Sequence, residues 1–237
     1  MPSFAELLDI LYEDNHLLVL NKPAGWPTTH YDGGDETVDR LAKAYLKEKY
    51  GKPGNVFLGV VHRLDKPTSG VLAFARTSKA ASRLSEQFRE RAVEKIYWAV
   101  VDLPTPELPK EFIGQWGTWD DWLWINDAAN KVEVVDADHF DSTEARTHFQ
   151  WKAFHGKQAL LELRPQTGRK HQLRAQLASR GWPIHGDTKY GSKFAFGSGI
   201  GLHARSLSFL HPTKTEPMTL LAEVPKAWRG RFAYLLA

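Results

Sequence analysis

The sequence predicts an α+β fold with a mixed, largely antiparallel central sheet flanked by helices and loops. Short apolar runs typical of strands outnumber the segments with helical periodicity, and the two kinds do not alternate strictly along the chain. The 237 residues are 42% hydrophobic and 25% charged, which is ordinary for a globular protein with a sizeable core. No break in composition marks a linker, so we expect a single domain over residues 1–237.

In the first half of the chain, apolar runs bounded by turn residues predict strands at 17–20, 56–61, 71–75 and 96–101. Two helices are expected between them. The first carries Val38, Leu41 and Tyr45 at helical spacing, with Thr37 as its N-cap and Gly51 just past its end. The second runs from about Ser78 to Arg91, and its apolar face consists of Ala81, Leu84 and Phe88.

The second half contains an aromatic segment, Trp116 to Ile125, that is typical of a hairpin. Further strands are expected at 145–154, 159–163, 207–210 and 218–222. Thr167 is the expected N-cap of a helix that carries Leu173 and Leu177 and is closed by Gly181. A terminal helix is predicted over 225–236.

Composition excludes several classes of protein. The chain has no cysteine, which excludes a disulfide scaffold and a thiolate metal site. No apolar run approaches the ~20 residues that span a bilayer, and residues 1–9 lack the features of a signal peptide. The glycine-rich phosphate loop, the dinucleotide fingerprint and paired histidines at metal spacing are also absent. We therefore expect a soluble, cytoplasmic protein without a nucleotide cofactor or a metal.

Charge is distributed unevenly along the chain. Residues 155–237 contain 13 Lys and Arg but 4 Asp and Glu, whereas residues 1–154 contain 18 and 24. A basic C-terminal stretch suggests a surface that faces a polyanion. A solvated basic face is the alternative, and charge alone leaves both open.

The segment His62 to Gly70 places a carboxylate, Asp65, in a turn between two predicted buried strands. Arg63 and Lys66 flank it with positive charge. A buried carboxylate needs partners because desolvation disfavours its ionised form. Asp65 therefore either caps its own turn, a common role of Asp, or performs chemistry, and the residues alone leave both interpretations open.

The pattern His62-Arg63-Leu64-Asp65-x-x-Thr68-Ser69-Gly70 resembles the signature of the RluA-type family of RNA pseudouridine synthases. Further matches follow in the family's order at 21–25, at Tyr97 within 95–100, at 164–174, at 183–191 and at 202–204. Two departures stand out. The chain begins almost at the catalytic domain, so we expect no N-terminal S4 domain, and Gln176 stands where the family's third motif usually continues to a second histidine.

The resemblance implies conversion of specific uridines in structured RNA to pseudouridine by a monomeric catalytic domain. Ribosomal RNA is the favoured substrate, with transfer RNA as the other option. No cofactor, metal or energy source is needed. Asp65 is the implied nucleophile or base, Tyr97 stacks on the uracil and relays a proton, and Arg169 forms an ion pair that keeps Asp65 ionised.

The resemblance also implies substrate-binding residues. Leu173 packs against the flipped base, Arg63 supports the Asp65 loop or a phosphate, and Lys22 supports the Asp65 loop. Lys170 and Arg174 contact RNA phosphates. Further phosphate contacts are expected from Arg180, Lys189, Lys193 and Arg205. Two other functions compete with this interpretation. One is an RNA-binding protein without turnover, and the other is a carboxylate-dependent N-glycosidase that releases uracil.

Overall fold

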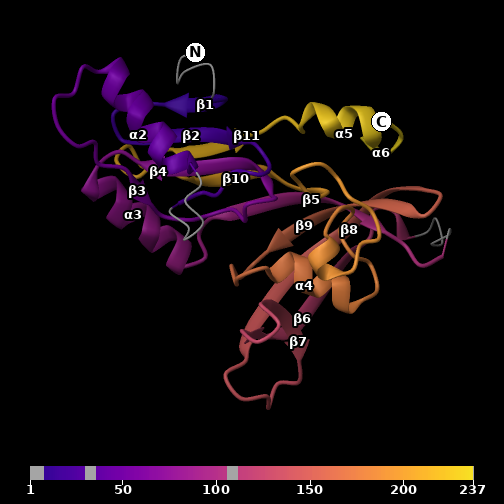
Figure 1. Cartoon of the computed structure of the whole chain (residues 1–237). Coiled ribbons are helices and arrows are strands. Elements are labelled where there is room, and N and C mark those ends of the chain that lie inside the picture. The colour runs from indigo at the N-terminus through magenta and orange to yellow at the C-terminus, as the bar shows by residue number, and fades with distance from the viewer. Residues whose placement is uncertain (1–7, 30–35, 106–111, 237) are drawn as a thin grey trace. The chain divides into compact units, whose positions relative to one another are not determined.

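The computed structural model describes residues 8–29, 36–105 and 112–236 (Figure 1). The chain divides into two compact units. Unit 1 consists of residues 1–94 and 204–223, and unit 2 consists of residues 95–203 and 224–237. The single domain expected over residues 1–237 stays a prediction.

The strands of unit 1 form a sheet around β4 (Ser69–Ala75), whose seven residues are all buried. The neighbouring strands follow in the order β1 (Ile10–Glu13), β2 (Leu17–Lys22), β4 and β10 (Leu202–Leu210). Two short strands, β3 (Gly59–Val60) and β11 (Pro217–Leu221), pair with β4 and β10. Burial on both faces explains why β4 has an apolar sequence without alternation.

Two helices belong to unit 1, α2 (Val38–Lys49) and α3 (Ser78–Arg89). Both begin and end close to the predicted positions. Thr77 caps α3, since its side chain accepts the Ala80 N–H. Thr37 precedes α2 as predicted, but its hydroxyl donates to the Asp39 carboxylate and makes no capping hydrogen bond to the backbone.

The strand expected at 56–61 is wrong for most of its length. Only Gly59 and Val60 pair with β4. Phe57 and Val60 are 51% and 41% exposed, so this apolar run lies largely at the surface. An apolar run predicts burial only where the fold supplies a covering layer, and here just Leu58 is buried.

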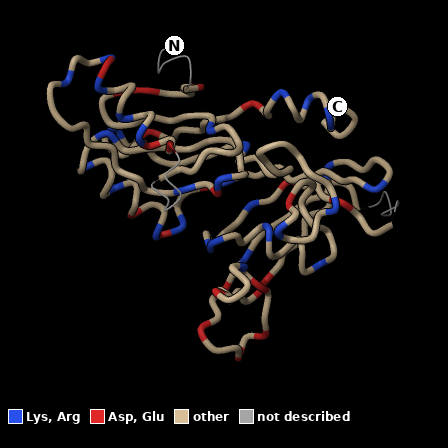
Figure 2. Tube along the Cα trace, viewed as in Figure 1, with Lys and Arg blue, Asp and Glu red and all other residues tan. Residues whose placement is uncertain are grey.

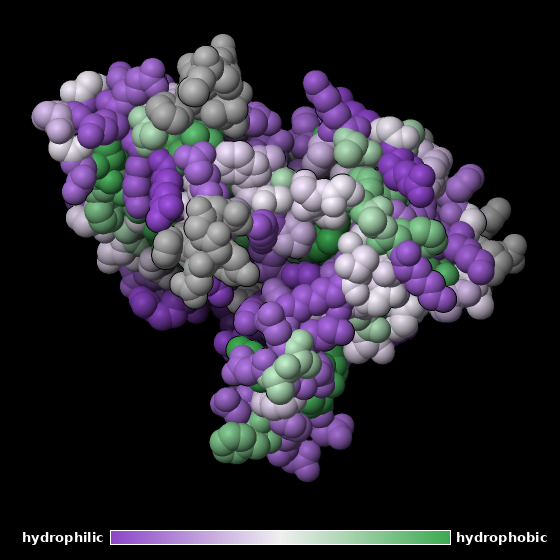
Figure 3. Space-filling model, viewed as in Figure 1, coloured by the Kyte–Doolittle hydropathy of each residue, from purple (hydrophilic) through white to green (hydrophobic). Residues whose placement is uncertain are grey.

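The strands of unit 2 form an antiparallel sheet in the order β5 (Glu94–Asp102), β9 (Gln158–Pro165), β8 (Thr143–His155), β6 (Trp116–Asn126) and β7 (Lys131–Val135). The segment Trp116 to Ile125, predicted to have hairpin character, lies within a single strand, β6, which forms a hairpin with β7, a strand that the sequence did not predict. The surface of the hairpin and of the loop after β7 mixes hydrophilic and hydrophobic residues (Figure 3), among them the exposed side chains of Trp122 and Ile125 in β6 and of Phe140 in the loop.

Helix α4 (Gln172–Ser179) packs on the sheet of unit 2 through Leu173 and Leu177, as predicted (Figure 1). Its predicted start is wrong. The helix begins after His171, which adopts a left-handed conformation with φ of 50°, and the Thr167 hydroxyl instead donates to Gln172 Oε1 at 2.7 Å. Because the hydroxyl makes this side-chain hydrogen bond, it does not cap a backbone N–H at the start of the helix.

The predicted terminal helix is interrupted. It forms α5 (Lys226–Arg231) and α6 (Ala233–Leu236), which are separated by the buried Phe232. Trp228 and Phe232 pack on Val100 and Leu160 of the sheet. The helix is interrupted at Phe232, whose ring is buried in this cluster.

The α+β class with a largely antiparallel sheet is confirmed, since the strand pairings of defined register are antiparallel in both units. Among the described residues, no helix has the length and apolar character that crossing a bilayer requires.

Candidate active site

Asp65 lies in unit 1, in the turn that leads into β4. Its carbonyl accepts the Thr68 N–H at 3.0 Å, and the side chain is partly buried. The preceding residue is fixed on both sides by Thr28, whose hydroxyl donates to the Leu64 carbonyl at 2.8 Å and accepts the Leu64 N–H at 3.1 Å. The backbone on either side of Asp65 is therefore held by short hydrogen bonds.

Other residues of this motif also have structural tasks. Gly70 has φ of +116°, and a Cβ at this position would collide with the backbone of Ala204, so only glycine fits. His62 Nε2 accepts the Ala73 N–H at 2.9 Å, and its ring stacks on Phe88 with centroids 4.8 Å apart. Arg63 is exposed, in keeping with the predicted support of the loop or a phosphate.

Lys22 is fully buried beneath this turn. Its Nζ donates to the carbonyls of Pro23 at 3.0 Å, Trp26 at 2.8 Å and Lys66 at 3.2 Å. Burial lowers the pKa of Lys22 to about 7, and the negative charge of Asp65 opposes that shift. The contact with Lys66 agrees with the predicted support of the Asp65 loop, whereas burial leaves Lys22 no surface for a ligand.

Tyr97 lies in unit 2, on β5 opposite Leu163 of β9. The ring is partly buried and packs against a hydrophobic cluster that includes Leu163 and Leu173. Tyr97 and Leu173, predicted to contact the target base, thus belong to one cluster. Leu173 is 6% exposed, so packing within this cluster is its main role.

Arg169 is exposed in the turn before α4. Its Nε donates to the Glu144 carbonyl at 3.0 Å, and its backbone N–H donates to Gln172 Oε1 at 3.1 Å. Gln172 in turn donates to Thr147 Oγ1 at 2.9 Å. The turn that carries Arg169 is therefore tied to the sheet at two points.

Gln176, the departure from the family motif, extends this network. It is fully buried; its Oε1 accepts the Thr147 hydroxyl at 2.7 Å, and its Nε2 donates to Asp121 Oδ2 at 2.8 Å. A chain of hydrogen bonds, buried at its centre, thus connects Asp121 with the turn of Arg169 through Gln176, Thr147 and Gln172. The sequence pattern gave no signal for it, because its members come from distant elements.

The predicted phosphate contacts differ in their surroundings. Lys170 is exposed, next to Arg169. Arg174 is 5% exposed and forms a bidentate ion pair with Asp187, with N–O distances of 2.7 and 2.8 Å. Its guanidinium is thus committed within unit 2, which argues against the predicted contact with RNA. Arg180 similarly donates to Asp121 at 3.1 Å.

The predicted residues thus form one group in each unit. Unit 1 contains Lys22, Arg63, Asp65 and Arg205, and unit 2 contains the rest. The ion pair of Asp65 with Arg169 and the approach of Tyr97 stay predictions. Within the described residues, no group of three or more His, Asp and Glu side chains is placed to hold a metal ion.

Comparison with known proteins gives consistent matches. Residues 16–179 match the family model described as RNA pseudouridylate synthase. The chain is 33% identical over 249 residues to tRNA pseudouridine synthase C of Pectobacterium carotovorum subsp. carotovorum, covering 94% of this chain and 61% of the relative. It is 33% identical over 243 residues to ribosomal large subunit pseudouridine synthase D of Xanthomonas campestris pv. campestris, covering 92% and 66%. The structure of human RNA Pseudouridylate Synthase Domain Containing 4 matches with a TM-score of 0.75 at 28% identity, covering 95% of this chain and 93% of that one.

Proposed function

Because the chain belongs to the RNA pseudouridylate synthase family, we propose that it isomerises specific uridines of structured RNA to pseudouridine, with Asp65 as the catalytic carboxylate. The observation that carries the proposal is the match over residues 16–179, which includes Asp65, Tyr97 and Arg169. The short hydrogen bonds around the Asp65 turn support it, because a catalytic group must be held in a defined geometry.

In the proposed reaction the N1–C1′ bond of uridine breaks, the uracil turns, C5 bonds to C1′ and loses its proton, and N1 takes up a proton, so that the product is an isomer of the substrate. Asp65 acts by attack at C1′, by addition at C6 or by a glycal route. Tyr97 stacks on the uracil and relays the C5 proton, and Arg169 is the cation for the Asp65 carboxylate. These roles rest on the resemblance of the motifs.

The target base has to leave its stack to reach a carboxylate that is partly buried. A flipped base is held by stacking and by contacts to the flanking backbone, so RNA binding is part of the proposal. The names of the relatives include a transfer RNA and a ribosomal RNA enzyme, and both substrates are retained, with ribosomal RNA favoured. A cytoplasmic monomer without a cofactor is proposed as well.

The test uses transfer RNA and ribosomal RNA transcripts labelled with tritium at uridine C5. Release of tritium into water without free uracil is the expected result. Free uracil would indicate a glycosidase, and RNA binding without either product would indicate a binding protein. Either outcome overturns the proposal.

Asp65→Asn is expected to abolish tritium release while the circular dichroism spectrum and RNA affinity stay unchanged, because the neutral amide keeps the shape but cannot act as nucleophile or base. Asp138→Asn, an exposed position in the loop after β7, is the matched control and is expected to keep full activity. Activity that survives in Asp65→Asn would contradict the assignment of Asp65.

A further inference from the structure

Three segments of unit 2 meet at the hydroxyl of Tyr190, the last residue of the short 3-10 helix η2 (Thr188–Tyr190). The hydroxyl accepts the Val132 N–H at 2.9 Å and lies 2.9 Å from His171 Nδ1. Val132 belongs to the edge strand β7, and His171 directly precedes α4. The turn before α4, the start of β7 and η2 are therefore fastened to one another.

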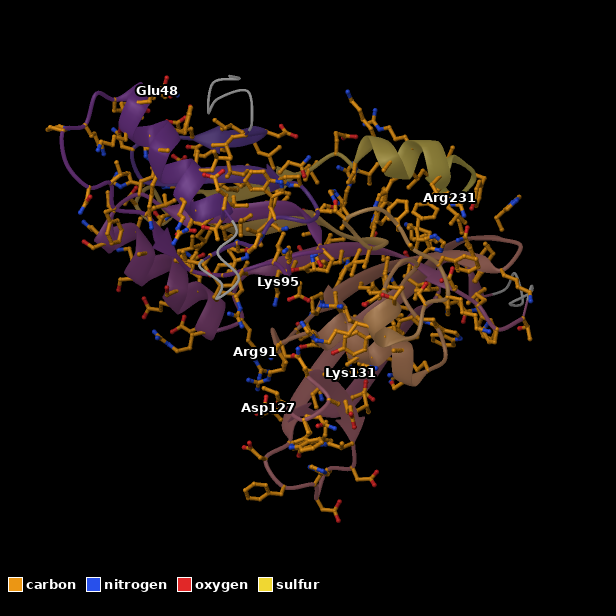
Figure 4. The ribbon with its side chains drawn as sticks, viewed as in Figure 1. Glu48, Arg91, Lys95, Asp127, Lys131 and Arg231 are labelled. Atoms are coloured by element: carbon orange, nitrogen blue, oxygen red, sulfur yellow. The ribbon has the colours of Figure 1, made fainter. Side chains whose placement is uncertain are left out.

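Each of the three fastened residues directly follows a lysine. Lys131 precedes Val132, Lys170 precedes His171 and Lys189 precedes Tyr190. Figure 4 shows Lys131 beside α4, at the end of the β6–β7 hairpin that lies nearest to this helix. Three lysines from three elements are thus brought together around one rigid point.

No described carboxylate forms an ion pair with this group, although Asp187 acts on Lys189 through its charge and Asp127 lies in the same hairpin turn as Lys131. Asp187 is 2% exposed, and both of its oxygens accept hydrogen bonds from Arg174, whose guanidinium lies 4.9 Å from the centre of the Tyr190 ring. None of the three lysines forms an ion pair with any described residue. The acidic residues of the loop after β7 lie at the opposite end of the hairpin (Figure 2).

The mutual repulsion of these charges is visible at Lys189. Burial lowers its pKa most, and the positive charges of Arg174, Lys170 and Lys131 lower it further, whereas Asp187 opposes the shift. Cations that the fold holds close together attract an anion strongly. The free-energy cost of bringing the like charges together is incurred when the protein folds, so it does not reduce the free energy of binding.

We propose that Lys131, Lys170 and Lys189 form a lysine clamp that binds backbone phosphates of the RNA substrate. The identification of the anion as RNA rests on the proposed function. A lysine ammonium group binds phosphate as a point charge. Three such groups, held on elements that are fastened to one another, are placed to contact phosphates of the RNA backbone. Because Lys170 directly follows Arg169, the clamp positions the RNA strand next to a proposed catalytic residue.

The test is the salt dependence of binding to an unmodified transfer RNA transcript. The triple variant Lys131→Gln/Lys170→Gln/Lys189→Gln is expected to reduce the slope of log K against log salt by about 0.7–0.9 for each lysine that contacts a phosphate, so by about 2 to 3 in total. The control triple variant is Lys152→Gln/Lys157→Gln/Lys226→Gln, which removes the same charge from exposed positions of unit 2 that have no predicted contact with RNA. An unchanged slope, or an equal reduction in the control, would overturn the clamp.

Tyr190→Phe tests the geometry separately, because it removes the fastening hydroxyl and keeps every lysine. We expect Tyr190→Phe to bind the same transcript more weakly than the wild type does, and equal affinity would overturn a preorganised clamp.

Tritium release at saturating RNA separates this proposal from the proposed function. Clamp variants are expected to need more RNA than the wild type to reach their own maximal rate of tritium release. A wild type that binds RNA through these lysines but releases no tritium would refute only the proposed function.

Discussion

Lys22 in unit 1 and Arg174 in unit 2 are both buried cations, and their partners differ. Lys22 donates to three backbone carbonyls and interacts with Asp65 only through its charge. Arg174 forms a bidentate ion pair with a buried carboxylate, Asp187. Three carbonyl dipoles satisfy the donors of Lys22 but do not neutralise its charge, whereas the Asp187 carboxylate accepts two hydrogen bonds from Arg174 and also neutralises its charge.

The difference determines which cation can lose its charge. A guanidinium stays protonated in proteins at every accessible pH, so unit 2 keeps a permanent buried ion pair. Burial lowers the pKa of Lys22 to about 7, so the charge beneath the Asp65 turn changes close to neutral pH. The cation beneath the proposed catalytic carboxylate is thus the adjustable one, and the cation beside the proposed clamp is fixed.

The largest expected effect comes from breaking the ion pair of unit 2. Asp187→Asn leaves the Arg174 guanidinium buried without a counter-charge, so the free energy of unfolding is expected to fall by about 3–5 kcal/mol. Urea denaturation measures it. The control is Asp120→Asn, because Asp120 and its partner Arg146 have side chains that are 55% and 45% exposed and such pairs contribute about 1 kcal/mol or less. Equal losses in the two variants would contradict the difference between buried and exposed pairs.

The charge of Lys22 is expected to appear in the pH dependence of stability. Between pH about 7 and 10.5 the unfolded chain keeps this lysine protonated while the folded chain releases its proton. The unfolded state then binds more protons, so the free energy of unfolding rises with pH, by at most about 1.4 kcal/mol per pH unit. Below pH 7 both states are protonated and this contribution is constant. Urea denaturation of wild type and Lys22→Met from pH 6 to 9 isolates the effect.

Asp65→Asn sharpens this test. It removes the negative charge that raises the pKa of Lys22, so the rise in stability is expected to begin below pH 7. Lys22→Met itself leaves three carbonyls without their donor and is expected to be less stable than wild type at pH 9. Curves for wild type and Lys22→Met that run parallel across the whole range would show that Lys22 does not titrate there.

Elements whose evidence is local were predictable from the sequence. The apolar run of β4 and the helical spacing of Leu173 and Leu177 both gave the correct element. The start of α4 was not predictable, because the Thr167 hydroxyl bonds Gln172 and His171 takes a left-handed conformation. These choices depend on residues that are adjacent only in the fold.

The candidate site shows the same division. Two separate motifs, at 21–25 and 62–70, marked Lys22 and Asp65, and the structure shows that the Lys22 ammonium donates to the carbonyl of Lys66, which follows Asp65. The network through Gln176 was not predictable, since Thr147 lies 29 residues away and supplies its hydroxyl from a strand. The meeting of three lysines at Tyr190 is likewise absent from any local pattern.

The smallest expected effect concerns two buried neutral groups, the hydroxyls of two threonines, which differ in their hydrogen-bond partners as the two buried cations do. Thr28 and Thr68 are both buried beside the Asp65 turn, but the Thr28 hydroxyl makes two hydrogen bonds with Leu64 and the Thr68 hydroxyl has no partner among the described residues. Thr28→Val leaves a buried N–H and a buried carbonyl unpaired and is expected to cost about 1–3 kcal/mol of unfolding free energy. Thr68→Val keeps the shape and removes an unsatisfied hydroxyl, so a change within about 0.5 kcal/mol is expected. Urea denaturation measures the unfolding free energy of both variants, and hydrogen exchange of the Leu64 amide is expected to accelerate only in Thr28→Val. A larger loss of unfolding free energy in Thr68→Val would contradict the view that the hydrogen bonds of each hydroxyl determine its contribution to stability.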